Sequence, residues 1–318
     1  MREYLNFLGR ERTPFFFLIG YDSSDSYIVP LEELDGDIRF EMDGFTSRGE
    51  SMPRTRKPLR FKKDPAPFSV YKEKFDALQQ EIAAGNTYLA NLTMPTPVAS
   101  NCTLYELYLD ARAPFKLYFK DRFTVFSPER FIRINHDTIE TFPMKGTIDA
   151  ALPDAEETIL NDPKELAEHT MVVDLLRNDL SIVARQVRVE RFRYTETLKT
   201  AEKTLIQVSS HITGKLEPGW HTRLGDILLP LLPAGSITGT PKKKTVEILR
   251  HIEGYERGYF SGVFGYFDGY ALDSSVMIRY IERDGDNLVF KSGGGITTDS
   301  DAKKEYDELV DKVYVPIY

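Results

Sequence analysis

The sequence predicts an α+β fold, because strand-like and helix-like segments follow one another without the regular β-α-β alternation of a parallel sheet. Short apolar runs between turn residues predict strands over residues 1–45 and further strands up to about residue 148. The spacing of apolar residues predicts amphipathic helices over about 70–84, 162–180 and 302–313.

Local signals define several of these elements. Gly85-Asn86 would end the first helix, and Asp162-Pro163 is typical of the cap and first position of the second. Residues 46–66 are rich in Arg, Lys, Pro and Ser, which predicts an exposed connection. Residues 258–295 predict an antiparallel meander, with turn signals at Asp268-Gly269 and Asp284-Gly285.

Composition narrows the class of protein. The 318 residues suit one large domain or two small ones, and a net charge of −8 argues against nucleic-acid partners and against an anionic membrane surface. No apolar run approaches the roughly 20 residues that span a bilayer, and the first residues lack the apolar core of a signal peptide. Cys102 is the single cysteine, which excludes an internal disulfide. We therefore expect a soluble cytoplasmic protein.

Lys145 lies in a segment whose neighbours restrict the backbone. Pro143 precedes it and Gly146 follows it, so the chain turns tightly there and holds the lysine in place. A lysine amine becomes a nucleophile once its surroundings lower its pKa from about 10.4 toward neutrality. The segment alone also fits an ordinary exposed lysine in a turn.

Two predicted helices each carry a pair of glutamates three residues apart, a spacing that places both side chains on one face. The pairs are Glu165 with Glu168, and Glu305 with Glu308, which Lys312 follows on the same side. Four carboxylates could together bind one hard divalent cation such as Mg²⁺, which takes oxygen ligands. The same pattern fits two solvated helix faces with Glu308 and Lys312 as a surface ion pair.

Three consecutive glycines join a predicted strand to the last helix: Gly293, Gly294 and Gly295. Their backbone N–H groups can approach an anion closely, although a flexible turn has the same pattern. Arg279 is the only charge in a strand-like apolar run. A buried arginine beside glycines would suit a substrate carboxylate, whereas an edge-strand arginine would face water.

Residues 235–242 contain Ser236 and look at first like a phosphate-binding loop. The segment fails the test for that motif, because Gly239 is followed by Thr240-Pro241 and not by Lys-Ser/Thr. Proline also removes a backbone donor where the loop needs one. This argues against a nucleotide-binding protein.

Taken in order, these segments resemble the chorismate-utilising enzymes, and most closely the family of component I of aminodeoxychorismate synthase. Lys145 supports that subfamily, because the corresponding position is typically small in anthranilate synthases. The resemblance covers roughly residues 70–318, and its motifs lie at residues 127–131, 143–147, 165–169, 173–179, 235–239, 241–242, 293–296 and 299–305.

The resemblance implies two facing, mainly antiparallel sheets flanked by helices, with the active site in the cleft between them. Residues 1–66 would be a shortened N-terminal strand-rich segment packed into the same fold. Residues 67–318 would form the chorismate-binding catalytic domain, so that the chain is one integrated domain.

The resemblance also implies a reaction: chorismate and ammonia give 4-amino-4-deoxychorismate for p-aminobenzoate and folate biosynthesis. Lys145 would attack C2 of the ring while Glu129 protonates the departing C4 hydroxyl, and ammonia would then add at C4 and expel the lysine. Mg²⁺ would bind the ring carboxylate, held by Glu168 and Glu308 with support from Glu165 and Glu305. The residues implied to bind substrate are Arg279, Gly293, Gly294, Gly295, Lys312, Ser236 and Thr147.

Three positions depart from the family pattern. Phe142 stands where an arginine is usual before the proline of the lysine motif. Leu89 replaces a glutamine or lysine, which argues against water activation and hence against an isochorismate or salicylate synthase. Gln207 replaces a common histidine, so we do not expect the nearby His211 to be catalytic. The short N-terminal part also argues against a tryptophan feedback site.

The source of ammonia is predicted to lie outside the chain. Cys102 does not have the setting of a glutaminase nucleophile, so we expect a separate glutamine amidotransferase subunit and a separate lyase. Two alternatives remain open. Anthranilate synthase component I would use the same scaffold but add ammonia at C2 and eliminate pyruvate, and a chorismate-binding protein would perform no turnover.

Overall fold

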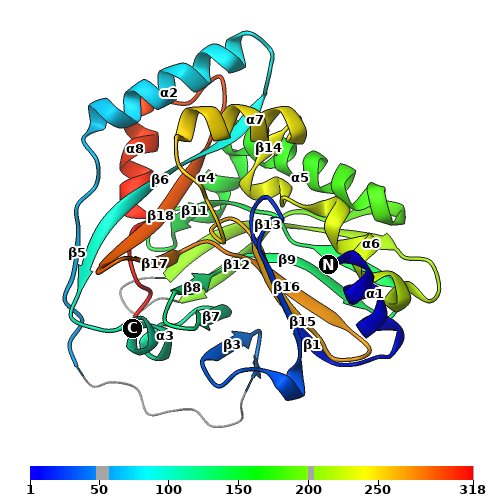
Figure 1. The fold of residues 1–318 in the computed structure, drawn as a ribbon. Helices are drawn as coiled ribbons and strands as arrows, with labels where there is room; N and C mark the ends of the chain where they lie inside the picture. Colours follow the sequence, from blue (N-terminus) through cyan, green and yellow to red (C-terminus); the bar gives the residue numbers. More distant parts are fainter. Residues whose placement is uncertain (48–56, 200–203, 318) are drawn as a thin grey trace.

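The computed structural model describes residues 1–47, 57–199 and 204–317. Within this part of the chain, the strands form two antiparallel sheets flanked by helices, so the predicted α+β class is confirmed (Figure 1). The strands of the first sheet are β1 (Phe15–Ile19), β2 (Ser26–Pro30), β9 (Arg130–Asn135), β10 (Thr138–Thr141), β11 (Met144–Asp149), β12 (Arg185–Lys199), β13 (Thr204–Lys215), β15 (Val263–Phe267) and β16 (Leu272–Val276).

The second sheet also contains nine described strands: β3 (Ile38–Met42), β4 (Phe45–Thr46), β5 (Phe61–Lys63), β6 (Leu89–Ser100), β7 (Phe115–Phe119), β8 (Phe123–Ser127), β14 (Gly239–Thr240), β17 (Tyr280–Asp284) and β18 (Asn287–Ile296). The described α-helices are α1 (Arg2–Arg10), α2 (Phe68–Ala83), α3 (Leu104–Asp110), α4 (Ala155–Asn161), α5 (Pro163–Val183), α6 (Leu224–Leu228), α7 (Lys242–Glu253) and α8 (Ala302–Asp311). Four 3-10 turns connect them: η1 (Leu31–Glu33), η2 (Trp220–Arg223), η3 (Leu229–Leu231) and η4 (Gly235–Ile237).

Strand β1 is buried on both faces and shows how the layers meet. Phe16 and Leu18 belong to a core cluster shared with β3, β7 and β8 of the second sheet. Phe15, Phe17 and Ile19, which point the other way, belong to a cluster that includes residues of α1, α5 and α6. One face of the first sheet therefore packs on the second sheet, and its other face packs on helices.

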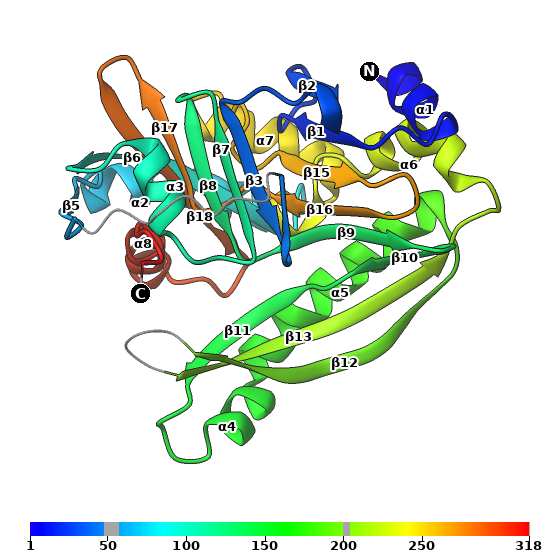
Figure 2. The same ribbon diagram turned by 90° about the horizontal axis from the view of Figure 1, so that it is seen from below.

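Helices α2, α7 and α8 cover the second sheet at β6 and β18 through a further apolar cluster (Figure 1). Helix α5 runs along β11, β12 and β13 of the first sheet (Figure 2). No helix in the described ranges is long and apolar enough to cross a membrane.

The predicted helix starts and stops are confirmed where local chemistry determines them. The Asp162 side chain accepts hydrogen bonds from the backbone N–H groups of Lys164 and Glu165, and Pro163 is the first residue of α5. Gly85, with a φ of +76°, follows the end of α2. Asp301 caps α8 in the same way as Asp162 caps α5.

The predictions for the N-terminal part and the connections are only partly correct. Strands were expected over residues 1–45, and β1, β2 and β3 confirm them, but α1 also forms there because Leu5 and Leu8 pack into the core on one face of a helix. The connection predicted at 46–66 contains β5, which pairs with β6; residues 48–56 of that prediction lie outside the described part.

The predicted meander is also wrong as a single unit. Strands β15 and β16 form a hairpin in the first sheet, and β17 and β18 form a hairpin in the second. Both turn signals are correct, since Gly269 and Gly285 have φ values of +99° and +58° in the two hairpin turns. The glycine run is not a loop, because all three glycines pair with β6 within β18.

Candidate active site

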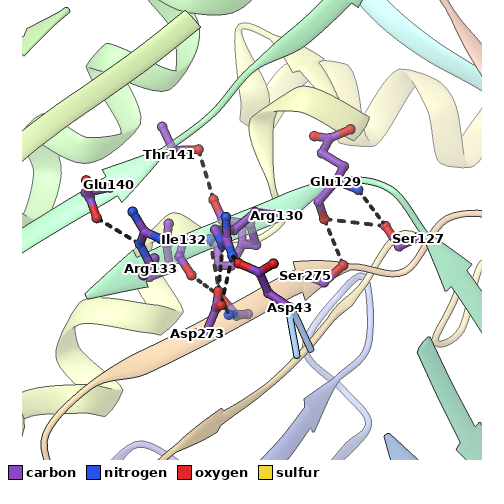
Figure 3. A network of polar contacts seen from close by, with 12 residues as sticks. Asp43, Ser127, Glu129, Arg130, Ile132, Arg133, Glu140, Thr141, Asp273 and Ser275 are labelled. Atoms are coloured by element: carbon purple, nitrogen blue, oxygen red, sulfur yellow. Dashed lines mark hydrogen bonds and ion pairs between the residues drawn. The ribbon is translucent and has the colours of Figure 1, made fainter. Parts of the chain in front are cut away.

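The chain passes between the two sheets at several points, and two of these crossovers each carry a predicted site residue. Glu129 lies between β8 and β9, and its carbonyl oxygen accepts a hydrogen bond of 2.7 Å from the Ser275 hydroxyl at the end of β16 (Figure 3). Arg279 lies between β16 and β17, and its carbonyl oxygen accepts from the Phe126 N–H at 3.1 Å. Each crossover is thus bonded to the strand that leads into the other, which fixes both residues.

The expectation that Arg279 alternates within a strand is therefore wrong. Its φ of +53° is a left-handed value that the crossover imposes. Its guanidinium lies 5.3 Å from the ring centre of Tyr314, and its buried Nε has no hydrogen-bond partner. Among the described residues no carboxylate forms an ion pair with it. A partly buried guanidinium with an unpaired Nε can bind an anionic ligand group.

A cavity of about 230 Å³ lies at these crossovers and is lined by residues of both sheets, α5 and α8. Nine of the predicted site residues line it: Glu129, Lys145, Thr147, Ser236, Arg279, Gly293, Gly295, Glu308 and Lys312. The other four lie beside it. A Cβ atom at Gly294 would lie 3.5 Å from Glu305 Oε2 and 3.8 Å from Lys312 Nζ, and Glu165 and Glu168 contact the Lys145 segment as described next.

Lys145 extends from β11 into the cavity. Its Nζ lies 3.7 Å from Glu168 Oε2 and 3.3 Å from the position of a Cβ atom on Gly295. Gly146 follows with a φ of +89°, and a Cβ atom there would lie 2.9 Å from Glu165 Oε2. Glycine at 146 therefore avoids both backbone strain and a clash with Glu165, and glycine at 295 leaves room for the lysine amine.

The Glu129 carboxyl group lies in the same cavity, pointing away from the contacts that hold its backbone (Figure 3). Burial raises its pKa, despite the opposing hydrogen bond from Ser236 and the positive charges of Lys145 and Arg279. A carboxyl group whose pKa is raised is suited to act as a general acid.

Helices α5 and α8 bring the four predicted carboxylates to one side of the cavity. Lys164 Nζ lies between the helices, 3.6 Å from Glu168 Oε1 and 3.9 Å from Glu305 Oε1. Burial and the neighbouring Glu168 raise the pKa of Glu165, and burial also raises that of Glu305. Like-charged carboxylates of this kind are stabilised by a nearby cation.

The donor chemistry of this cluster fits magnesium, since carboxylate oxygens are its usual protein ligands. Among the described residues, no three His, Cys, Asp or Glu side chains are grouped closely enough to hold a metal ion. Lysine ammonium groups bridge the carboxylates instead. Glu308 pairs with Lys312 at 2.6 Å, and Lys312 also donates to the Gly293 carbonyl oxygen at 2.9 Å.

The three residues that depart from the family pattern, Phe142, Leu89 and Gln207, have different surroundings. Gln207 lines the cavity, whereas His211 stacks on Phe142 and binds Glu140 Oε1 at 2.9 Å. This agrees with the expectation that His211 is not catalytic. Leu89 is buried, with its Cδ1 3.2 Å from the position of a Cβ atom on Gly295. It therefore places an apolar group beside the glycine run.

Sequence reasoning gave no role to several residues of the site. Asn91 and Lys291 line the cavity from β6 and β18, and Lys291 is paired with Glu282 at 2.7 Å. Arg257, which is buried, donates to the carbonyl oxygens of Asn91 and Ile237 and so holds two cavity-lining segments. No local pattern distinguishes these residues, because their partners are distant in the chain.

The model of a known family matches most of this chain. The match is to the chorismate binding enzymes and covers residues 22–317. The chain belongs to this family. A protein named "uncharacterized PabA-like protein" from Haemophilus influenzae is 47% identical over 316 residues, which cover 99% of this chain and 96% of that protein.

More distant members are named for their reactions. Aminodeoxychorismate synthase component 1 of Klebsiella aerogenes is 33% identical over 259 residues, covering 76% of this chain and 56% of that protein. Anthranilate synthase component 1 of Archaeoglobus fulgidus is 31% identical over 255 residues, covering 76% and 61%. The chain thus spans little more than half of these synthases.

A solved structure confirms the fold. The menaquinone-specific isochorismate synthase MenF of Escherichia coli superposes with a TM-score of 0.73 at 17% identity, covering 97% of this chain and 79% of that one. The architecture of two antiparallel sheets flanked by helices is therefore that of chorismate-utilising enzymes.

Proposed function

We propose that this protein aminates chorismate at C4 to give 4-amino-4-deoxychorismate, through a covalent adduct on Lys145. The observation that carries the proposal is the presence of a lysine amine and a carboxyl group of raised pKa in one cavity. Lys145 and Glu129 both line that cavity, and burial raises the pKa of Glu129. The likeness to aminodeoxychorismate synthases supports it.

In the first step the Lys145 amine attacks C2 of the ring, both ring double bonds shift, and the C4 hydroxyl leaves with the proton of Glu129. In the second step ammonia attacks C4, both double bonds shift back, and the C2–N bond breaks to release Lys145. Glu168, 3.7 Å from the amine, is placed to accept the proton that the lysine must lose.

The substrate carboxylates would have two sets of partners among the residues at the cavity. Arg279 has a buried Nε without a hydrogen-bond partner, and the glycine run lets a carboxylate approach the backbone of β18. Magnesium, held by Glu168 and Glu308 with Glu165 and Glu305 in support, would neutralise the ring carboxylate when bound.

The ammonia would come from a separate glutamine amidotransferase. The relatives named component 1 support such a partner. Cys102, the single cysteine of the chain, is buried in an apolar cluster, and burial raises the pKa of its thiol. It therefore lacks the properties of a glutaminase nucleophile.

Product analysis tests the proposal. The purified protein is incubated with chorismate, magnesium and ammonium at mildly alkaline pH, with Lys145→Ala and the surface variant Lys244→Ala in parallel. We expect aminodeoxychorismate, convertible to p-aminobenzoate by added lyase, from all but Lys145→Ala. Anthranilate as the product would assign the protein to the alternative that the Archaeoglobus relative favours.

A further inference from the structure

A buried histidine links the carboxylate helix to the strands of the lysine segment. His169 follows Glu168 on α5 and is 1% exposed. Its Nε2 lies 2.7 Å from the hydroxyl oxygen of Ser210, a fully buried residue of β13. His169 does not line the cavity, and the proposed reaction does not use it.

Ser210 is bonded in turn to the start of the Lys145 segment. Its backbone N–H donates to the Pro143 carbonyl oxygen at 3.0 Å. Its hydroxyl oxygen also accepts the Arg193 N–H at 2.9 Å, so the side chain is held from two sides. The neighbouring Ser209 is the register partner of Met144 on β11. A continuous path of bonds therefore runs from α5 through His169 and Ser210 to the residues before Lys145.

His169 is placed to make this link, since its ring is buried and lies within hydrogen-bond distance of Ser210. Its Nδ1 is buried without a hydrogen-bond partner among the described residues. A buried ring that is hydrogen-bonded to Ser210 fixes the spacing between the helix and the strand.

We propose that His169 is a positioning residue, which through Ser210 sets the place of the Lys145 amine relative to Glu168. The separation of 3.7 Å between Lys145 Nζ and Glu168 Oε2 spans β11 and α5, and the His169–Ser210 bond ties α5 to β13, the strand that pairs with β11. The functional consequence rests on the proposed role of Lys145, whereas the positioning itself does not.

The test compares Ser210→Ala and His169→Ala with two matched variants. Ser209→Ala removes an equally buried hydroxyl, which donates to Glu196 at 2.6 Å and not to α5. His169→Gln keeps a polar atom near the place of Nε2. The first readout needs no substrate: the rate at which acetic anhydride acetylates Lys145, followed by mass spectrometry relative to the exposed Lys244. The second is kcat and KM for chorismate.

We expect Ser210→Ala and His169→Ala each to raise the relative acetylation rate of Lys145 about threefold or more, because the amine is freed from its ion pair. We expect kcat to fall about tenfold with KM changed less than about twofold, as a misplaced reacting group predicts. The double variant His169→Ala/Ser210→Ala should lose no more kcat than either single variant. Ser209→Ala should match the wild type in both readouts. His169→Gln should recover most of the kcat that His169→Ala loses.

Unchanged acetylation in folded Ser210→Ala and His169→Ala variants would overturn the proposal, as would an equal effect of Ser209→Ala. If Ser210→Ala does not fold, the comparison of His169→Ala with His169→Gln decides alone. If the wild-type protein aminates nothing, the proposed function fails, while the acetylation rates still decide whether His169 positions Lys145.

Discussion

Lys242 Nζ lies 2.8 Å from Asp179 Oδ1, and both side chains are largely shielded from solvent. This ion pair ties the end of α5 to the start of α7, on either side of the turn that carries Ser236. A Cβ atom at Gly235 would lie 2.6 Å from Asp179 Oδ2, so the turn packs directly on the carboxylate. The pair therefore holds the serine that meets Glu129.

Breaking this pair should destabilise the protein strongly. Asp179→Asn leaves the Lys242 ammonium without its counter-charge, and we expect a loss of about 3 kcal/mol in the free energy of unfolding. Adding Lys242→Met should recover part of that loss. Urea unfolding measures both. The control is Arg177→Met, which breaks an exposed ion pair with Asp174 on the same helix and should cost under about 1 kcal/mol. Equal costs for the two would contradict the assignment.

Lys145→Arg keeps the positive charge beside Glu168 but removes the nucleophilic amine. We expect kcat to fall at least about a thousandfold while KM for chorismate changes less than about tenfold. Steady-state kinetics and intact-protein mass spectrometry with chorismate but without ammonia measure this. A mass adduct on the wild-type protein, absent from the variant, is the expected result. Near-normal turnover by Lys145→Arg would exclude covalent catalysis.

Glu129→Gln should separate stability from activity. Burial raises the pKa of Glu129 in the folded protein. The protonated side chain therefore stabilises the fold fully at pH values below the pKa of the unfolded chain, about 4.3. This stabilisation is lost as the pH rises through the higher pKa of the folded protein. The variant should therefore be more stable than the wild type at pH 8, with the difference shrinking toward pH 4. Its kcat should fall about 10²- to 10⁴-fold.

Urea unfolding at several pH values gives the stability of this variant, and Glu256→Gln, at an exposed position, is the control. A stability difference that does not change with pH would show that Glu129 titrates alike in the folded and unfolded states.

Lys164 should compete with magnesium for the carboxylates. Partial burial lowers the pKa of Lys164, but Glu168 and Glu305 outweigh this effect and raise the pKa overall. A charged ammonium group therefore lies between the carboxylates of the two helices. We expect Lys164→Met to tighten magnesium binding about tenfold at low ionic strength, and Glu168→Gln to weaken it. Titration calorimetry with magnesium alone measures both. Lys303→Met, which removes a surface lysine of α8, should have no effect, and weaker binding by Lys164→Met would count against the site.

Arg279→Gln should act mainly on substrate binding. The variant removes a charged donor from the cavity, and the loss of a charge-assisted bond of about 1.5–3 kcal/mol predicts a KM for chorismate about 10- to 150-fold higher. Fluorescence or calorimetric binding with a chorismate analogue should change in parallel. Arg283→Gln, at an exposed position that pairs with Asp121, is the matched control. A normal KM would mean that Arg279 serves only to pack on Tyr314.

Contacts between residues close in the chain were sufficient to predict much of the fold. Asp162 and Pro163 start α5 because the cap needs only the next three residues, and Gly269 and Gly285 form hairpin turns because each hairpin is local. The resemblance supplied the two-sheet architecture and the set of residues around the cavity. These motifs include residues whose backbone shapes the cavity, such as Gly146 with its φ of +89° and the glycine run that pairs with β6.

Only the tertiary structure decided which sheet each C-terminal hairpin joins and where the site residues lie relative to one another. The two C-terminal hairpins joined different sheets because their pairing partners, β9 for one and β6 with β8 for the other, lie more than 100 residues earlier. The same long-range pairing placed Arg279 at a crossover and not in a strand. It also brought α5 and α8 together around Lys164, and His169 against Ser210. Burial and electrostatic shifts depend on such distant neighbours, because a side chain loses water only when another part of the chain covers it.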